Sequence, residues 1–562
     1  MSVAVPPTGE RVDAGLRIRW LGTVAYREAL AVQEALFQHG REDHLLLLEH
    51  PHVFTYGPRA DLEHNLRCDP AAVGADFVGI RRGGDITYHG PGQLVGYPIL
   101  NIPSEFGAAA HVRNVEQLVI DALATFGVDA GRLVEYPGVW VDPQGPNPRK
   151  ICAIGVRLKR GRTMHGFALN VAPDMTYLRQ HIVACGIPDR PVTSLAEEGV
   201  DVSMREVVDV VARLAEERWG GGSAERQDVA WRHRVDDLAL FSRGAGPGEP
   251  VRLTSRLAAA GVTTGLSIES RKPAWLRPKV HHGPEVLALK KTIRDLDLVT
   301  VCEDAGCPNL SECWSDGTAT FMVLGERCTR ACGFCLVDTR KPLAPAADEP
   351  ARVAEAIARM GLDHAVLTMV ARDDLPDGGM AHVAACVEAI RARRPGTRVE
   401  TLISDARGVG SSLELLFGAR PDVLNHNVET VPRLQRAVRP SAGYARSLSV
   451  LARAKAAGLT TKSGLIVGMG ETDAEVEGTL ADLAGIGVDI VTIGQYLRPT
   501  SHHLPVERWV EPATFAAWAA TGEALGIGHV EAGPLTRSSY HAKAAAESVT
   551  AVALLPRAVP SA

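Results

Sequence analysis

Hydrophobic and polar positions alternate in a regular order through the second half of the chain. Apolar runs with the length of β-strands occur at 320–324, 364–370, 398–403, 422–428, 461–467 and 488–496. Stretches with apolar residues at helical spacing separate them, at 351–360, 380–394, 411–417, 444–457 and 474–486. Six strands that alternate with helices predict a parallel sheet, whose functional side chains gather at the carboxyl ends of the strands.

The first half mixes strand and helix patterns less regularly. Short apolar runs at 45–49, 94–100 and 151–158 predict buried strands. Residues 111–126 predict a helix, because apolar residues recur at Val112, Val115, Leu118, Val119 and Ala122. This half is therefore predicted to be a mixed α/β domain.

Glycine-rich segments at 220–223 and 244–248 divide the chain into two unlike halves. The stretch between them, 231–240, could form a short helix that closes the first half. We expect one domain over residues 1–243, a connector over 244–270 and a second domain over 271–562. A chain of 562 residues is long enough for two domains of this size.

The composition excludes several classes of protein. Hydrophobic residues make up 46% and charged residues 22%, which is ordinary globular usage. The net charge of -6 gives no footprint of nucleic-acid binding, and no apolar run is long enough to span a membrane. Met1 to Arg11 lack the pattern of a signal peptide, so we expect a cytoplasmic protein. Six of the ten cysteines lie between Cys302 and Cys335, and such a cluster favours metal binding over disulfides.

Cys328, Cys332 and Cys335 place three thiols on one loop after the first predicted strand of the second half. Three thiolates can hold a [4Fe-4S] cluster with one iron left open. A zinc site is the alternative, but no second CxxC element or neighbouring histidine accompanies the motif. The spacing resembles that of the radical S-adenosylmethionine (SAM) superfamily, which implies that SAM binds the open iron. A second triple, Cys302, Cys307 and Cys313, predicts a second cluster.

Longer motifs resemble the lipoyl synthase family from about Arg271 to Lys543. They are Cys307-Pro308-Asn309, the segments 271–276, 425–432 and 464–472, and Arg537-Ser538-Ser539-Tyr540. The resemblance implies a partial (β/α)6 barrel and an auxiliary [4Fe-4S] cluster that donates sulfur. Its ligands would be Cys302, Cys307, Cys313 and Ser539, with Ser538 as the less favoured serine. Asn427 and Glu429 project to the same face of one predicted strand, because side chains alternate with period two. They are therefore candidates for contact with SAM or substrate, or structural polar groups.

In the first half, Cys185 is followed by a glycine that allows close approach, and Lys150 opens an apolar strand. A lysine beside a thiol would favour the nucleophilic thiolate, but the sequence alone leaves their contact open. Cys152, two residues after Lys150, is the rival nucleophile.

Motifs at 82–93, 150–155, 165–170 and 184–186 resemble lipoyl(octanoyl) transferase over residues 17–215. The resemblance implies the fold of the biotin and lipoate protein ligases. It also implies that Cys185 carries the acyl thioester and that Lys150 activates it. The implied acyl pocket is lined by Arg82, Gly83, Gly84, Asp85, Ile86, Thr87, Tyr88, His89, Ala153, Ile154, Gly155, Gly166, Phe167 and Ala168. A nucleotide site in the glycine-rich segment is disfavoured, because no GKS or GKT follows it.

The two resemblances together predict a bifunctional enzyme of lipoate biosynthesis that uses SAM and two [4Fe-4S] clusters. Its expected partners are octanoyl-acyl carrier protein, the lipoyl domains of 2-oxo acid dehydrogenases, the glycine cleavage H protein and an electron donor. Arg157, Lys159, Arg160 and Arg162 could dock acidic carriers or form a solvated face. The alternatives are an ATP-dependent lipoate ligase in the first half, radical chemistry on another substrate, one degenerate half, or a non-catalytic scaffold or electron-transfer protein.

Overall fold

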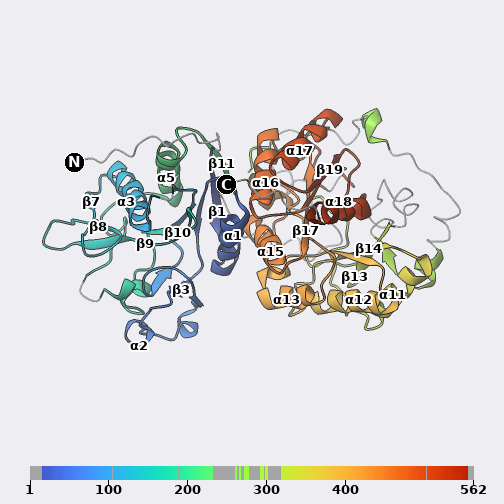
Figure 1. Ribbon diagram of the computed structural model, residues 1–562, viewed down its shortest axis with the longest axis horizontal. Coiled ribbons are helices and arrows are strands. Elements are labelled where there is room, and N and C mark those ends of the chain that lie inside the picture. Colours follow the sequence, from blue (N-terminus) through green and yellow to red (C-terminus); the bar gives the residue numbers. More distant parts are fainter. Residues whose placement is uncertain are drawn as a thin grey trace. The chain divides into compact units, whose positions relative to one another are not determined.

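The computed structural model divides the chain into two compact units, Met1–Trp231 and Arg232–Ala562 (Figure 1). The structure describes residues 15–103, 105–187, 190–231, 260–262, 265–266, 271–277, 291–296, 298–300, 318–500 and 503–554. The predicted helix at 231–240, apart from Trp231, and most of the predicted connector lie outside these ranges. Cys302, Cys307 and Cys313 also lie outside the described residues.

The first unit is built on an eight-stranded mixed sheet in the order β11-β1-β2-β6-β10-β9-β8-β7. The strands are β1 (Leu16–Thr23), β2 (His44–Glu49), β6 (Gln93–Ile99), β7 (Ala130–Gly131), β8 (Val139–Val141), β9 (Arg149–Lys159), β10 (Arg162–Asn170) and β11 (Ala224–Asp228). The helices α3 (Ala108–Thr125) and α5 (Met204–Trp219) pack their apolar sides into the core of this sheet. The three predicted strands and the predicted helix are present as β2, β6, β9 and α3. The helix α1 (Tyr26–His39) contacts β6 and β10.

A smaller three-stranded sheet extends the first unit, in the order β4 (Asp76–Gly79), β3 (Val53–Tyr56) and β5 (Thr87–His89). The short helices α2 (Leu62–Asn65) and α4 (Thr176–Arg179) accompany it, and residues of α2, α4, β3 and β5 share one apolar cluster. This sheet matters for function because β5 continues the glycine-rich segment 82–86, and because the turn that carries Cys185 hydrogen-bonds to Ile86.

The second unit contains the expected parallel sheet, with its strands in sequence order. β13 (Thr318–Val323), β14 (His364–Met369), β15 (Arg398–Leu402), β16 (Val423–Asn425), β17 (Thr460–Val467), β18 (Ile490–Gln495) and β19 (His529–Gly533) pair in parallel, and β12 (Val299–Thr300) adds an antiparallel edge. The seventh parallel strand, β19, was not predicted. β12 and β19 are the two edges of this sheet.

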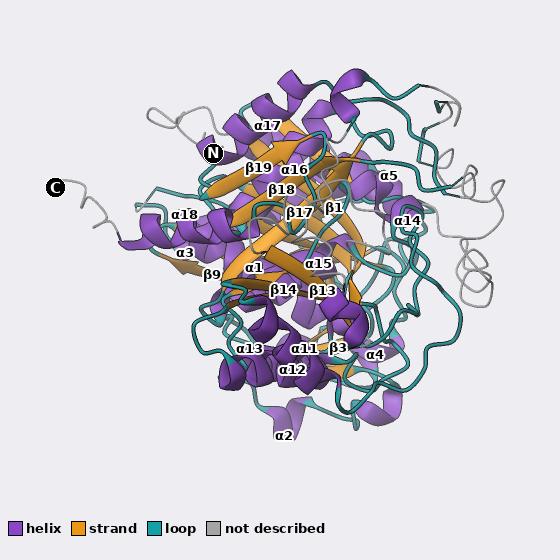
Figure 2. Cartoon of the chain, turned by 90° about the vertical axis from the view of Figure 1, so that its right-hand side faces the viewer, coloured by secondary structure: helices purple, strands orange, loops and turns teal. Residues whose placement is uncertain are grey.

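Helices connect consecutive strands of this sheet and flank it in Figure 2. They are α11 (Glu349–Met360), α12 (Met380–Arg393), α13 (Gly410–Gly418), α14 (Gln435–Val438), α15 (Tyr444–Ala456), α16 (Asp473–Gly485), α17 (Pro512–Ala524) and α18 (Ala542–Leu554). Five of these helices match the predicted ones within two residues at each end. The core between α11, α12, α13 and strands β13 to β16 is formed by their apolar faces and includes Cys386, which is fully buried as a small core residue.

One strand is shorter than predicted. β16 ends at Asn425, and Glu429 has a φ of 64°, which breaks the extended conformation. The expectation that Asn427 and Glu429 project to the same face of one strand is therefore wrong. Both residues belong instead to the segment that follows the carboxyl end of β16.

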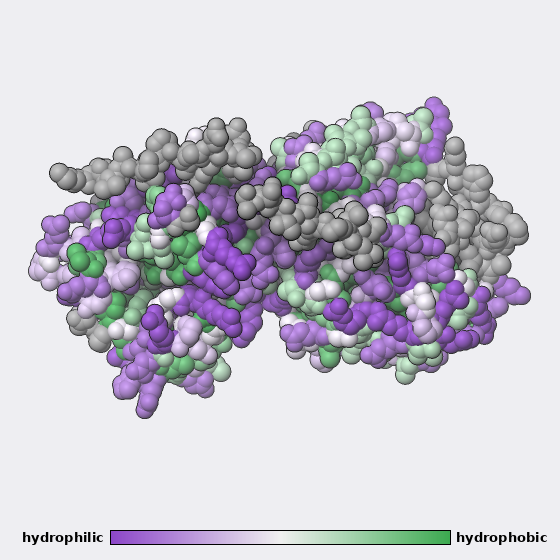
Figure 3. Space-filling model, in the orientation of Figure 1, coloured by the Kyte–Doolittle hydropathy of each residue, from purple (hydrophilic) through white to green (hydrophobic). Residues whose placement is uncertain are grey.

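Hydrophilic and hydrophobic side chains are interspersed over the face of each unit drawn in Figure 3. Among the described residues, the structure contains no helix with the length and apolar character that crossing a membrane requires.

Candidate active sites

Cys185 lies in a tight turn, Ala184–Gly186, with an unusual backbone conformation. Its φ of 58° is in the left-handed region, which a residue with a Cβ seldom adopts. Its N–H donates to the carbonyl oxygen of Ile86 at 2.9 Å, and the N–H of Val183 donates to Asn65 at 2.8 Å. Strained backbone of this kind is commonly kept at functional sites, where the surroundings hold the side chain in place.

The turn of Cys185 packs directly against the glycine-rich segment. Asp85 accepts hydrogen bonds from the N–H of Ile86 at 2.6 Å and from the side chain of Asn65 at 3.0 Å. A Cβ placed on Gly186 would lie 3.3 Å from a carboxylate oxygen of Asp85. The close approach and the positive φ of 67° at Gly186 explain the glycine after the thiol.

Lys150 is held on the second residue of β9 by backbone pairing. Its N–H donates to Pro191 and its carbonyl accepts from Thr193, both at 2.9 Å. The side chain is buried, and Nζ lies 5.4 Å from the centre of the Trp140 ring. A Cβ on Gly138 would lie 2.7 Å from Cε of Lys150, so a side chain at position 138 would displace the lysine.

The charges of both Lys150 and Cys185 act on the pKa of Cys152. Lys150 and Cys185 therefore lie near the same buried thiol. Burial, which is complete, raises the pKa of Cys152 well above the ordinary value for a thiol. Its sulfur points into the core and lies 3.5 Å from the carbonyl of Ala153. This environment disfavours the thiolate and makes Cys152 a poor rival to the half-buried Cys185.

The predicted acyl-pocket segments come together around Arg82. Its guanidinium donates to the carbonyl and hydroxyl oxygens of Thr55 at 2.9 and 3.1 Å. A Cβ on Gly155 would lie 3.1 Å from Cδ of Arg82 and 3.3 Å from the carbonyl of Gly83. Burial lowers the pKa of Arg82, and the charge of Cys185 opposes this shift. The glycine-rich segment therefore lies over Ala153 to Gly155 with its arginine close to Cys185.

Two further predicted pocket residues, Gly166 and Tyr88, lie in different surroundings. Gly166 pairs with Gly155 across β9 and β10, and a Cβ there would lie 2.1 Å from the carbonyl of Gly96. Tyr88, by contrast, stacks on Tyr177 with ring centres 4.7 Å apart, in the core of the small sheet.

Of the buried histidines near Arg82, sequence reasoning placed His89 in the acyl pocket and missed His50 and His165. Nε2 of His50 lies 2.7 Å from the hydroxyl of Tyr97, and His89 contacts Gln93 at 2.8 Å. His165 has a φ of 62°, and burial, with the charges of Arg82 and Arg157, lowers its pKa to about 4. Burial likewise lowers the pKa of His50 to about 4, so these rings are neutral near pH 7. Nothing in the sequence separates His50 and His165 from ordinary core histidines.

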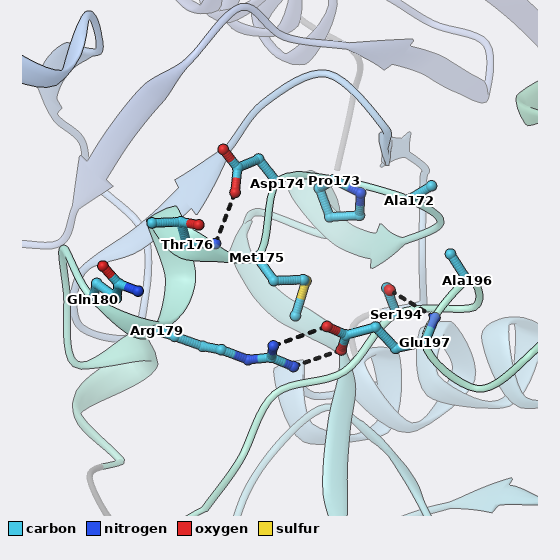
Figure 4. A pocket seen from close by; sticks show the side chains of 10 residues that line it. All are labelled: Ala172, Pro173, Asp174, Met175, Thr176, Arg179, Gln180, Ser194, Ala196 and Glu197. Carbon is cyan, nitrogen blue, oxygen red and sulfur yellow. Dashed lines mark hydrogen bonds and ion pairs between the residues drawn. The ribbon is translucent and has the colours of Figure 1, made fainter.

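A polar pocket of about 430 Å³ lies beside this region, in the first unit (Figure 4). Arg179 and Glu197 form an ion pair across it at 2.5 Å, and Ser194 continues the segment that pairs with Lys150. None of the predicted acyl-pocket residues lines it.

In the second unit, the cysteine loop follows β13 and is anchored on three sides. The N–H of Cys328 donates to Asp338, that of Thr329 to Ala371, and that of Gly333 to Val438, at 2.8 to 3.0 Å. Burial and the neighbouring sulfurs raise the pKa values of Cys332 and Cys335 to about 12. The three thiols are half-buried, and the charges of Cys328 and Cys332 act on Cys335. Among the described residues, no three His, Cys, Asp or Glu side chains are arranged as a metal site. Thiolates are nevertheless the ligands that iron–sulfur clusters take, so the residue types fit such a cluster.

Histidine reaches this loop from a distant part of the sequence. Nε2 of His503 lies 3.0 Å from the carbonyl oxygen of Cys335, and Nδ1 lies 2.8 Å from the hydroxyl of Thr500. The sequence therefore missed a histidine beside the motif. Both ring nitrogens are engaged, so His503 supports the loop and does not complete a zinc site with the three cysteines.

Arg330, between Cys328 and Cys332, ties the loop to the strand ends. It forms a bidentate pair with Asp373 at 2.7 and 2.8 Å and donates to Asp405 at 2.6 Å. Asp405 is fully buried, and the guanidinium holds its pKa at about 2 against the effect of burial. Asp373 and Asp405 follow the ends of β14 and β15, and no local pattern in the sequence indicates that they share a partner.

Asn427 joins the segment after β16 to the serine pair near the C-terminus. Its amide nitrogen donates to the hydroxyl of Ser538 at 2.7 Å and to Glu429 at 3.1 Å. Its amide oxygen is buried without a hydrogen-bond partner. Burial raises the pKa of Glu429, whose charge acts on Cys332 and Cys335. Ser538 is thus already engaged, whereas no hydrogen bond joins the Ser539 side chain to another residue in the part of the chain that the structure describes.

Comparisons with known proteins agree with this division. The model of the lipoyl protein ligase A/B catalytic domain matches residues 25–215, and that of the radical SAM superfamily matches residues 322–483. The lipoyl synthase of Rubrobacter xylanophilus is 53% identical over 273 residues, which cover 48% of this chain and 85% of the relative. That of Mycobacterium avium is 54% identical over 272 residues and is covered to 89%.

The chain belongs to the lipoyl synthase family. Its first half is a catalytic domain of the lipoate ligase and transferase type, so the protein is an enzyme with two catalytic domains. The lipoyl synthase domain implies SAM and iron–sulfur clusters.

Solved structures resemble single parts of the chain. A bipartite lipoate protein ligase with its E2 lipoyl domain from Thermoplasma acidophilum is 21% identical, with a TM-score of 0.32, and the match covers 38% of this chain and 86% of that one. SuiB of Streptococcus suis bound to S-adenosylmethionine is 11% identical, with a TM-score of 0.29, and the match covers 39% and 50%.

Proposed function

We propose that this chain builds the lipoyl group in two steps: the first unit attaches an octanoyl chain to a carrier protein, and the second inserts two sulfur atoms into it. The observation that carries the proposal is the pairing of two sites in one polypeptide. One is Cys185, half-buried in a strained turn, which together with the buried Lys150 acts on Cys152. The other is the set of three half-buried thiols on the loop that follows β13.

In the first step, the Cys185 thiolate attacks the thioester carbonyl of octanoyl-acyl carrier protein. The new Cys185 thioester forms as the bond to the carrier thiol breaks, and that thiol leaves with the proton taken from Cys185. Lys150 is suited to hold this proton, because it is buried near the thiol. Arg82 and Gly83, packed over Gly155, form a wall along which the acyl chain is positioned.

In the second step, the amine of a lysine on a lipoyl domain attacks the Cys185 thioester. An amide forms, the bond to Sγ breaks, and Cys185 is regenerated. An amide is more stable than a thioester, so transfer proceeds forward. The acceptors we propose are the lipoyl domains of 2-oxo acid dehydrogenases and the glycine cleavage H protein.

For sulfur insertion, Cys328, Cys332 and Cys335 would hold one [4Fe-4S] cluster, and Cys302, Cys307, Cys313 and Ser539 an auxiliary one. When bound, these groups supply the one-electron cleavage of SAM, hydrogen abstraction at carbons 6 and 8, and two sulfur atoms. Asn427 supports the choice of Ser539, because it already occupies the hydroxyl of Ser538. Arg330 holds the cysteine loop against Asp373 and Asp405, which keeps the three thiols oriented.

One assay tests both steps. Octanoyl-acyl carrier protein, an apo lipoyl domain, SAM and a reductant are supplied to the anaerobically reconstituted full chain, and the domain is weighed by intact-mass analysis. We expect the mass of an octanoyl group first and two added sulfur atoms later. Cys185→Ser should abolish both products, whereas Cys328→Ala should stop at octanoylation. Octanoylation that requires ATP and releases AMP would instead identify a ligase and refute the transferase step.

A further inference from the structure

We propose that Arg81, Arg157, Lys159 and Arg160 form a docking strip for the acidic carrier protein that delivers the octanoyl thioester. This inference rests on the proposed function of the first unit. The four residues are named here the basic strip. Arg81 directly precedes the glycine-rich segment 82–86, and the other three lie in the β9–β10 hairpin.

The basic strip begins at the acyl pocket and runs outward along β9. Side chains alternate along a strand, and the β9–β10 register is regular, so Arg157 and Lys159 share the side of Gly155. Gly155 in turn packs under Arg82 and Gly83. Arg160 follows Lys159 in the hairpin turn, where its φ is 53°.

A buried histidine links Arg81 to Arg157. The ring of His165 hydrogen-bonds to the backbone of Arg81, and the charges of Arg82 and Arg157 both act on it. Because its pKa is lowered to about 4, His165 is neutral near pH 7 and adds no charge of its own. Arg81 and Arg157 therefore both lie close to His165, the residue that precedes Gly166.

The charges of the strip are largely uncompensated. Arg81, Lys159 and Arg160 are exposed, Arg157 is half-buried, and none of the four forms an ion pair with a described residue. The carboxylate of Glu34 on α1 acts on both Arg157 and Arg81. Glu34 thus offsets part of the charge of Arg81 and Arg157, whereas Lys159 and Arg160 add two exposed positive charges, so the surface is positive.

Two surface arginines of α5 in this unit are neutralised by carboxylates on the same helix. Arg205 pairs with Asp209 at 3.8 Å and Arg213 with Glu217 at 2.8 Å. The hairpin turn offers Lys159 and Arg160 no such partner among the described residues, so their charges are open to an anionic carrier.

Arg162, which was expected to belong to this docking surface, does not. It is buried and donates to the carbonyl oxygens of Leu36 and Glu42 and to the side chain of Asn101. Because Arg162 pairs with Lys159 across the hairpin, these bonds fix the base of the turn that presents the strip.

The chemistry of the strip fits a donor that is anionic close to its thioester. An octanoyl chain on acyl carrier protein is attached through an arm that carries a phosphodiester, and arginine binds phosphate and carboxylate through paired N–H groups. Such a surface raises the rate of encounter and lowers the half-saturating concentration of the donor, while leaving the chemistry at Cys185 unchanged.

The test compares two donors in the full chain, octanoyl-acyl carrier protein and the uncharged octanoyl-pantetheine. The rate of octanoyl-Cys185 formation is followed by intact mass for wild type, for Lys159→Glu with Arg160→Glu, and for the matched control Arg205→Glu with Arg213→Glu. We expect the strip variant to raise the half-saturating concentration of the carrier-bound donor about tenfold or more and to weaken its salt dependence. The control should behave as wild type.

Each outcome decides. An unchanged response to the carrier-bound donor overturns the inference, and so does an equal loss with octanoyl-pantetheine, which would indicate a structural role. A loss confined to the later transfer to the lipoyl domain would assign the strip to the acceptor and overturn it as a donor site. Failure of wild type to form the adduct with either donor would refute the proposed function itself.

Discussion

Replacing Arg330 by methionine should destabilise the second unit and prevent cluster assembly. Arg330 makes three hydrogen bonds to two aspartates, and one of them, Asp405, is fully buried. Removing one member of a buried ion pair costs about 3–5 kcal/mol. Arg446, 3.9 Å from the same carboxylate, compensates only part of the charge that Arg330 leaves behind. The partly exposed pair with Asp373 adds about 1 kcal/mol at most. We therefore expect a loss of about 4 kcal/mol in the free energy of unfolding of this unit.

The loss is measured by urea and thermal unfolding of the full chain, in the transition that the substitution shifts. A change of this size lowers the melting temperature by roughly 10 °C for a unit of this length. Arg340→Met is the matched control, because Arg340 lies near the same loop but forms an exposed pair with Asp338 at 2.6 Å. Its stability should stay close to that of wild type, because an exposed ion pair contributes little. Iron bound per chain after reconstitution is the second readout, and it should fall for Arg330→Met alone.

Adding Asp405→Asn separates the charge from the packing. In the double variant no buried carboxylate is left unpaired, so the double loss should be smaller than the sum of the single losses. Strict additivity, or a single-variant loss within about 1 kcal/mol of wild type, would refute the reasoning that Arg330 compensates a buried charge.

Three further variants test other parts of the structure. Lys462 holds the pKa of the buried Glu400 at about 2, below the ordinary value of 4.5. Their interaction therefore contributes stability above about pH 4.5, and this stability is lost as the pH falls toward 2. Glu400→Gln with Lys462→Met should flatten the acid side of the plot of unfolding free energy against pH. Cys152→Ser should keep the octanoyl adduct in intact-mass spectra but cost about 1–3 kcal/mol, because it buries a hydroxyl in the core. Gly155→Val should slow adduct formation from both donors by crowding Arg82, and an unchanged rate would place the acyl chain elsewhere.

Sequence reasoning reached most of the regular elements and fell short where the backbone departs from regularity. The strands β13 to β18 follow from runs of apolar residues, since a strand buried on both faces needs little polar surface. β16 ends at Asn425, before the predicted end of this strand. No local sequence pattern indicates the left-handed conformation of Glu429 in the segment that follows. Arg162 was taken for a surface cation within a basic run, although its three hydrogen bonds lie inside the fold.

The sequence by itself determined which chemistry this protein can perform, because the spacing of Cys328, Cys332 and Cys335 and the motifs around Cys185 are local properties of the chain. Only the tertiary structure decided how these groups are supported. It brought Arg82 over Gly155, closed Arg330 onto Asp373 and Asp405, and buried Cys152 while leaving Cys185 accessible. The physical reason is that burial and charge compensation depend on residues distant in the chain, and these set the pKa and orientation of a side chain.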